Sequence, residues 1–250
     1  MQPSGKSPSR DQVFRDPRSQ IVDFVFDAQV AAVFPDMIRR SVPGYETLLP
    51  LTGLIAARHA LPGSRCYDLG CSLGATSLAL ARALDAADIQ DCPIIAIDNS
   101  ADMLAEAARL LPDVPRIQWQ QADITNLPLE AASVVVMNYT LQFVAPDARL
   151  PLLKRIWHAL LPGGVLLLAE KIRFDDAALQ DYMTELHLDF KRANGYSELE
   201  ISQKRTALEQ VMQPDSLATH QARLADAGFT TTTIWFQCLN WAGLIAHTDP

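Results

Sequence analysis

The chain has 250 residues, of which 49% are hydrophobic and 20% are charged, a balance typical of a globular protein of one large domain. Its 21 Lys and Arg residues stand against 29 Asp and Glu residues, which gives a formal net charge of −8. This acidic balance argues against broad binding to nucleic acid or to an anionic membrane, because phosphate groups bind a basic face.

The first 20 residues are polar and rich in Pro and Ser, so we expect residues 1–20 to be a disordered tail and residues 21–250 to form a single domain. The tail lacks the apolar core of a signal peptide, and the longest apolar stretch, near residues 48–57, is too short to span a bilayer. The four cysteines form no C-x-x-C pair and have no His at metal-ligand spacing. We therefore expect no metal site, and a reducing compartment, the cytoplasm, with no membrane partner.

Helical patterns open the folded part of the chain. Apolar residues recur at helical spacing from residue 27 to about residue 61. Pro35 and Pro43 are expected to break this layer into short helices, each proline standing in the first turn of the next helix.

Strands and helices then alternate. Short apolar runs predict strands at 65–69, 93–97, 117–120, 133–137 and 165–169, and helical patterns lie between them at 76–84, 101–111 and 147–160. Runs without polar alternation are typical of strands buried on both faces, and their alternation with helices indicates a doubly wound parallel sheet.

The rhythm changes after the fifth strand. Residues 174 to about 213 are expected to form a helical insertion, with a turn at Asn194-Gly195 and a capping box of Ser197 and Glu200 inside it. The chain is expected to close with a helix over 215–227 and two strands over 229–239 and 241–248.

The strongest motif lies where the first predicted strand turns into a helix, and it reads Asp68-Leu69-Gly70-Cys71-Ser72-Leu73-Gly74. Glycines there let the backbone approach a ligand, and in doubly wound sheets ligands bind in this crevice. The dinucleotide pattern G-x-G-x-x-G is not met, because Ser72 and Ala75 stand at glycine positions. The pattern D-x-G-x-[GS]-x-G instead resembles motif I of the class I S-adenosylmethionine-dependent methyltransferases, with a plain glycine-rich turn as the alternative.

Polar residues also follow the next three strands. Asp98, followed by Asn99, lies 24 residues past Gly74, the last residue of the glycine loop Gly70–Gly74. An acid at this place can accept both ribose hydroxyls of an adenosine. The alternative is that Asp98 simply caps the next helix. In class I methyltransferases the place of Asp123 and Ile124 contacts adenine. The place of Asn138 lies under the sulfonium and amino-acid part of the cofactor.

These marks imply the class I methyltransferase fold, an α/β, doubly wound, Rossmann-like architecture with a seven-stranded, mostly parallel sheet. In that fold an antiparallel C-terminal strand is inserted next to strand five. Here we expect extra N-terminal helices and the helical insertion of about 174–213 in addition.

Five segments carry a closer resemblance. They are VFPDMIRRSVPGY at 33–45, YDLGCSLGA at 67–75, IIAIDNS at 94–100, NYTLQF at 138–143 and DFKRANGYSELEISQKR at 189–205. These segments resemble the carboxy-S-adenosyl-L-methionine synthase family, and the resemblance covers about residues 20–248.

The resemblance implies an enzyme, a transferase that makes carboxy-S-adenosyl-L-methionine from S-adenosylmethionine and prephenate and releases phenylpyruvate. A sulfonium methyl proton is removed, and the resulting ylide captures the carbon dioxide that prephenate loses. The resemblance also implies a homodimer and a partner tRNA carboxymethyltransferase, which uses the product to form uridine-5-oxyacetic acid at the tRNA wobble position. The chain itself would not bind tRNA. The alternatives are a conventional small-molecule methyltransferase and a non-catalytic cofactor-binding partner.

Carried onto this sequence, the resemblance implies ten binding residues. They are Gly70, Cys71 and Ser72 in the cofactor loop, Asp98 and Asn99 at the ribose, Asp123 and Ile124 at adenine, Asn138 at the amino-acid moiety, and Tyr45 and Arg205 from the helical layers. Arg205 is expected to hold the new carboxylate, because a guanidinium is a fixed charge that suits carboxylates. The group that takes the methyl proton is left open, and the carboxylate of the donor could take it.

The remaining charged residues carry weaker signals. His187 and His220 lie on predicted helices and are expected to be surface or core histidines rather than bases. Three basic pairs follow the fifth strand, in the region that usually covers the substrate: Lys171/Arg173, Lys191-Arg192 and Lys204-Arg205. We expect them to be solvated charges, with a buried arginine that binds a carboxylate as the alternative.

Overall fold

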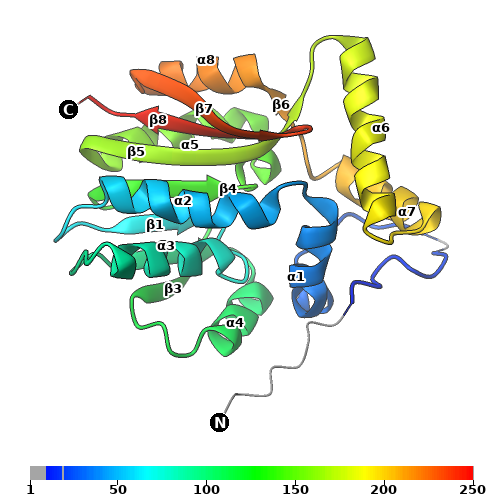
Figure 1. Cartoon of the computed structure of the whole chain (residues 1–250), viewed down its shortest axis with the longest axis horizontal. Helices are drawn as coiled ribbons and strands as arrows, with labels where there is room; N and C mark the ends of the chain where they lie inside the picture. Colours follow the sequence, from blue (N-terminus) through cyan, green and yellow to red (C-terminus); the bar gives the residue numbers. More distant parts are fainter. Residues whose placement is uncertain (1–9, 19, 250) are drawn as a thin grey trace.

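The computed structural model describes residues 10–18 and 20–249. Its centre is a sheet whose strands lie in the order β3-β2-β1-β4-β5-β8-β7 (Figure 1). The strands are β1 (Cys66–Leu69), β2 (Ile94–Asp98), β3 (Ile117–Gln121), β4 (Ala132–Asn138), β5 (Leu160–Arg173), β7 (Thr231–Cys238) and β8 (Trp241–His247). Strands β1 to β5 run parallel, whereas β8 is antiparallel to both β5 and β7. The predicted doubly wound sheet with an antiparallel strand next to strand five is confirmed.

Helices cover both faces of the sheet and one of its ends (Figure 1). They are α1 (Ala28–Ser41), α2 (Tyr45–His59), α3 (Ala75–Ala86), α4 (Ala101–Leu110), α5 (Pro146–Ala159), α6 (Ala177–Ala193), α7 (Glu198–Glu209) and α8 (Leu217–Ala227), with the short 3₁₀ helix η1 (Leu141–Phe143). The two-residue strand β6 (Asp215–Ser216) pairs with the end of β5. The extra helices α1, α6 and α7 stand beyond the carboxyl ends of the parallel strands, where they can cover a ligand site.

The side chains of β4 show how the core is built. Val134 and Val136 pack with α2 and α3 on one face, whereas Val135 and Met137 pack with α5 and α8 on the other. All four are fully buried. A strand covered on both faces needs apolar residues at every position, which explains the unbroken apolar run in the sequence.

Pro35 lies inside α1 and does not break the helix, so that part of the prediction is wrong. The carboxylate of Asp27 caps the first turn and accepts the N–H of Val30 at 2.9 Å. Val30 and Met37, one on each side of the proline, are buried in the same apolar cluster. This shared packing outweighs the one hydrogen bond that the proline removes. Pro43 does lie between α1 and α2, but it precedes the N-cap Gly44, so it is not in the first turn of α2 as predicted.

The N-terminal segment, residues 10–18, is packed against α1 and α7. The N–H of Asp11 donates to the carboxylate of Asp36 at 2.8 Å, and the side-chain amide of Gln203 donates to the carbonyl of Phe14 at 2.9 Å. Asp11 and Phe14 are both buried. The tail predicted over residues 1–20 is therefore wrong for this segment, because its partners lie on helices distant in the sequence. Residues 1–9 and 19 lie outside the described residues.

Two other elements bear on the site. Strand β5 is longer than predicted, because it begins at Leu160 and includes the Pro162-Gly163-Gly164 stretch. The predicted capping box is present at the start of α7, where the N–H of Ser197 donates to the carboxylate of Glu200 at 2.8 Å. Among residues 10–18 and 20–249, no helix combines the length and the apolar character needed to cross a bilayer.

Candidate active site

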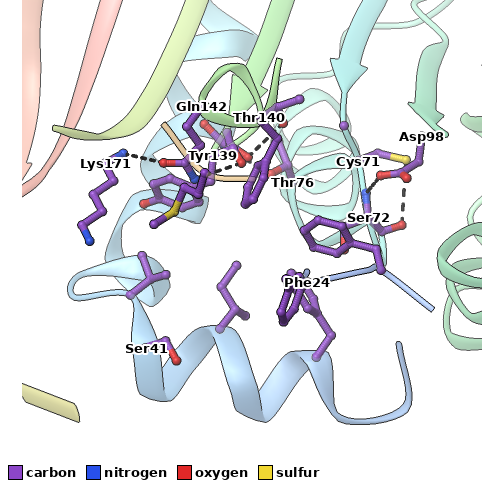
Figure 2. A pocket seen from close by; sticks show the side chains of 18 of the residues that line it. Phe24, Ser41, Cys71, Ser72, Thr76, Asp98, Tyr139, Thr140, Gln142 and Lys171 are labelled. Atoms are coloured by element: carbon purple, nitrogen blue, oxygen red, sulfur yellow. Dashed lines mark hydrogen bonds between the residues drawn. The ribbon is translucent and has the colours of Figure 1, made fainter. Parts of the chain in front are cut away.

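A cavity of about 850 Å³ lies at the carboxyl ends of the parallel strands, between the sheet and the helices α1, α6 and α7. Nine of the ten predicted binding residues line it: Tyr45, Gly70, Cys71, Ser72, Asp98, Asn99, Asp123, Ile124 and Asn138. Figure 2 shows Ser72 and Asp98 on one side of the cavity and Lys171 on the other. The strand ends and the start of α2 bring together residues that are up to 93 positions apart in the sequence, from Tyr45 to Asn138.

Asp98 connects the glycine loop to the next helix (Figure 2). One carboxylate oxygen accepts the N–H of Ser72 at 2.8 Å, and the other accepts the N–H of Ser100 at 2.9 Å. Burial raises the pKa of Asp98, although these backbone hydrogen bonds act in the opposite direction. The helix cap itself is Ser100, whose hydroxyl accepts the N–H of Met103. Asp98 is thus a cavity residue and not the side-chain cap of α4.

Asn138 ends β4 and presents an unsatisfied acceptor. Its side-chain N–H group donates to the Thr76 hydroxyl at 3.1 Å. Its Oδ1 atom is buried and has no hydrogen-bond partner among the described residues. A buried carbonyl oxygen without a partner at a cavity wall fits a ligand that donates a hydrogen bond, such as an ammonium group.

Asp123 and Ile124 lie at the rim, after β3. The Asp123 carboxylate accepts the N–H and the hydroxyl of Thr125 at 2.8 and 2.7 Å, and these bonds lower its pKa.

Four phenylalanines that we did not predict also line the cavity and form an aromatic wall: Phe24, Phe26, Phe34 and Phe143. The ring centroids of Phe26 and Phe143 are 5.4 Å apart in an edge-to-face arrangement. The alternating sequence Phe24-Val25-Phe26 was the available signal, since every second residue of an extended segment faces the same side.

Three lysines line the cavity, although we expected them to be solvated: Lys171 from β5, Lys191 from α6 and Lys204 from α7. Burial lowers the pKa of Lys191 to about 7, with smaller contributions in the same direction from the charges of Lys204 and Lys171. Burial, followed by the charge of Arg205, lowers the pKa of Lys171 to about 8. Burial also lowers the pKa of Lys204 to about 8.

Arg205 does not line the cavity. It is exposed on α7, and its charge acts on Lys171 and Lys191 only through space. The role predicted for Arg205 in holding a carboxylate stays a prediction.

His187 and His220 are both buried, so they are core and not surface histidines. His187 lines the cavity, and its Nε2 atom is 2.8 Å from the carbonyl of Ser41, which requires a proton on that nitrogen. Burial lowers the pKa of His187 to about 3, so the ring is neutral. His220 lies away from the cavity. In the part of the chain that the structure describes, no three His, Cys, Asp or Glu side chains gather as a metal site would need.

The comparisons with known proteins agree with this geometry. A family model described as a methyltransferase domain matches residues 67–164. Carboxy-S-adenosyl-L-methionine synthases of Pseudomonas putida, Aeromonas hydrophila and a Geobacter species are 55%, 53% and 52% identical to this chain. These alignments cover 94% or 95% of this chain and 96% or 97% of the relatives.

Solved structures show the same fold at low sequence identity. Human N-acetylserotonin methyltransferase in complex with SAM gives a TM-score of 0.61 at 17% identity, and the match covers 89% of this chain and 56% of that chain. The methyltransferase SibL in its apo form gives a TM-score of 0.64 at 18% identity, with 96% and 65% covered.

The family assignment rests on more than the methyltransferase core. The domain model stops at residue 164 and leaves out α6 and α7. An alignment over 94% of the chain includes most of both helices, and these helices supply two of the three cavity lysines. The chain therefore belongs to the carboxy-S-adenosyl-L-methionine synthases, a family of transferases.

Proposed function

We propose that this protein transfers a carboxyl group from prephenate to the methyl carbon of S-adenosylmethionine. The observation that carries the proposal is a cavity with two chemically different ends. Asp98 lies on one side and Lys171 on the other (Figure 2), and the wall also presents the unpartnered oxygen of Asn138; Asp98 and Asn138 suit an adenosyl amino acid. Plain methyl transfer needs no cationic end, whereas a carboxylated methyl group and an anionic donor both do.

The reaction balances without an oxidant or a reductant. Prephenate loses one carboxyl group as carbon dioxide and its ring hydroxyl as hydroxide, and the aromatic product is phenylpyruvate. The methyl group on sulfur loses a proton, and its carbon forms a bond to the carbon of the carbon dioxide. The proton and the hydroxide form water, so the products are carboxy-S-adenosyl-L-methionine, phenylpyruvate and water.

Each predicted residue has a role in this proposal. Asp98 binds the ribose hydroxyls, and Asn99 lies beside it. Asp123 and Ile124 flank adenine, and Asn138 accepts from the ammonium group of the amino-acid moiety. These roles are supported by the position of each residue on the cavity wall.

The glycine loop and the helical layers complete the binding set. Gly70, Cys71 and Ser72 form the floor under the cofactor, and Tyr45 closes the cavity from α2. We also propose a homodimer, in which the exposed Arg205 is free to serve a neighbouring subunit. A cytoplasmic location remains a prediction from the cysteine pattern and the polar N-terminal tail. A partner tRNA carboxymethyltransferase, which carries the product's carboxymethyl group to the wobble uridine, remains a prediction from the family resemblance.

Mass spectrometry tests the reaction directly. Purified protein is incubated with S-adenosylmethionine and prephenate, and we expect a product heavier than S-adenosylmethionine by one carbon dioxide, together with phenylpyruvate. Formation of S-adenosylhomocysteine from a small methyl acceptor would favour a conventional methyltransferase instead. Binding of S-adenosylmethionine with no turnover would favour a non-catalytic binding partner.

A further inference from the structure

Lys171 and Lys191 are cations in the cavity without counter-ions. Lys191 keeps only 9% of its surface exposed, and Lys171 is partly buried. Within residues 10–18 and 20–249, no hydrogen bond or ion pair reaches either ammonium group. Figure 2 shows the Lys171 side chain extending from β5 in the direction of Ser41 on α1.

Lys204 provides the internal comparison. Its ammonium group donates to the Ser41 hydroxyl at 2.9 Å and lies 3.7 Å from the carboxylate of Asp11. The N-terminal segment thus supplies Lys204 with a partner of opposite charge. Lys204 has a structural role in joining that segment to α7, whereas Lys171 and Lys191 keep their hydrogen-bonding capacity for a ligand.

An unpaired cation in a buried position is unfavourable for the free protein. Burial removes water from the ammonium group, and the neighbouring charges of Lys204 and Arg205 add repulsion, which is why the pKa of Lys191 falls to about 7. A bound anion would relieve both effects. Such groups in a cavity are typical of binding sites rather than of structural ion pairs.

The two cations come from different elements, β5 and α6, and therefore approach the cavity separately. Tyr139 and Trp241 also line the cavity, with ring centroids 5.0 Å apart, and Trp241 is the partner of Lys171 across the β5–β8 pair, so they form an aromatic surface beside it. We propose that Lys171 and Lys191 each bind one carboxylate of a dicarboxylate co-substrate, whose ring lies against this aromatic surface. This inference rests on the proposed function, in which the carboxyl donor is such a dicarboxylate.

The test uses substitutions that remove charge and keep the aliphatic stem. The variants are Lys171→Met and Lys191→Met, and the matched control is Lys154→Met on α5, where the lysine is exposed and does not line the cavity. Calorimetry measures Kd for prephenate in the presence of S-adenosylhomocysteine, which lacks the reacting methyl group. A second titration measures Kd for S-adenosylmethionine.

We expect each cavity variant to weaken prephenate binding by about tenfold or more, the size of a lost charged hydrogen bond, while Kd for S-adenosylmethionine changes by less than about threefold. The control should match the wild type. Phenylpyruvate, which has one carboxylate, should bind the wild type more weakly than prephenate. Wild-type prephenate affinity in either cavity variant would overturn the inference.

Thermal unfolding separates a binding role from a structural one. Because the removed cations have no partners, both variants should unfold at the same temperature as the wild type or higher. A variant that loses prephenate affinity and also unfolds at a lower temperature would contradict the assignment.

Failure of the inference and failure of the proposed function are distinguishable. If the wild type binds prephenate through both lysines but forms no carboxylated product, the anion site stands and the proposed reaction fails. If the wild type forms the product and both variants keep wild-type prephenate affinity, the reaction stands and the anion site fails.

Discussion

Glu170 shows how one buried side chain shapes the cavity at the scale of a residue. Its carboxylate, in β5, accepts the backbone N–H groups of Thr140, Leu141 and Gln142 at 3.1, 2.7 and 3.2 Å. Thr140 and Gln142 line the cavity, so Glu170 positions part of its wall without being a lining residue itself.

We expect Glu170→Gln to lower the free energy of unfolding by about 1–3 kcal/mol near pH 5, because an amide NH₂ group cannot accept and leaves a buried N–H unsatisfied. Burial raises the pKa of Glu170 from an ordinary value of 4.5 to about 8, so the folded state holds a proton that the unfolded chain releases. The stabilisation from that proton is complete below about pH 4.5 and is lost as the pH rises through about 8. The wild type should therefore lose stability relative to the variant over this window. Denaturant unfolding between about pH 5 and pH 9 measures the difference, and a constant difference would contradict the prediction.

The positions of some cavity residues could be predicted from the sequence, and those of others could not. Asp98 and Asn138 follow predicted strands, and strand ends in a parallel sheet meet at one edge, so their position in the cavity was predictable. The burial of Lys191 and Lys204 was not predictable, because it depends on α6 and α7 folding over that edge and on Asp11 reaching Lys204 from the N-terminal segment.

At the scale of elements, the turn from β1 into α3 sets the floor of the cavity. Gly70 has a φ of +80°, and a Cβ atom there would collide with the Thr140 side chain. Gly163, in β5, has a similar φ of +73°, but a Cβ atom there would meet nothing within 4 Å. The two glycines share the backbone strain of a substitution, and they differ in the collision and in position, because Gly70 lines the cavity and Gly163 does not.

We expect Gly70→Ala to weaken S-adenosylmethionine binding by about tenfold or more, because the collision displaces Thr140 or the loop that approaches the ligand. Gly163→Ala should cost about 1–2 kcal/mol of stability from the left-handed backbone and leave the affinity unchanged. Calorimetry and thermal unfolding of both variants measure the two effects. Equal effects of the two substitutions on affinity would show that the Gly70 backbone has no special role in ligand binding.

Elements with a regular pattern were the predictable part of the fold. The apolar run of β4 and the capping box of α7 each have a local physical cause that is visible in the sequence. The continuity of α1 through Pro35 was not visible, because it depends on packing of Val30 and Met37 in one cluster. The length of β5 depends likewise on its partners β4, β6 and β8.

At the scale of the whole molecule, the positive charge is divided between the cavity and surface ion pairs. Several exposed or partly exposed arginines are paired with carboxylates: Arg39 with Asp36, Arg65 with Glu130, Arg109 with Glu106, Arg173 with Asp175, and Arg192 with Asp189 and Glu198. The cavity holds three of the remaining cations, Lys171, Lys191 and Lys204. Exposed cations remain elsewhere, such as Arg58, Arg82, Lys154 and Arg205, but the net charge of −8 disfavours the approach of a polyanion.

This distribution predicts that the protein does not bind tRNA, even though its proposed product serves tRNA modification. A tRNA backbone is recognised by a basic surface that neutralises several phosphates at once, and a cavity of about 850 Å³ holds small anions but no nucleic-acid helix. Filter binding with total tRNA at physiological salt should give a Kd weaker than about 100 µM, and any retention at low salt should disappear steeply as salt is added. A Kd below about 1 µM at physiological salt would contradict the prediction, and it would imply that the carboxymethyl donor is delivered on the tRNA-bound enzyme rather than by diffusion.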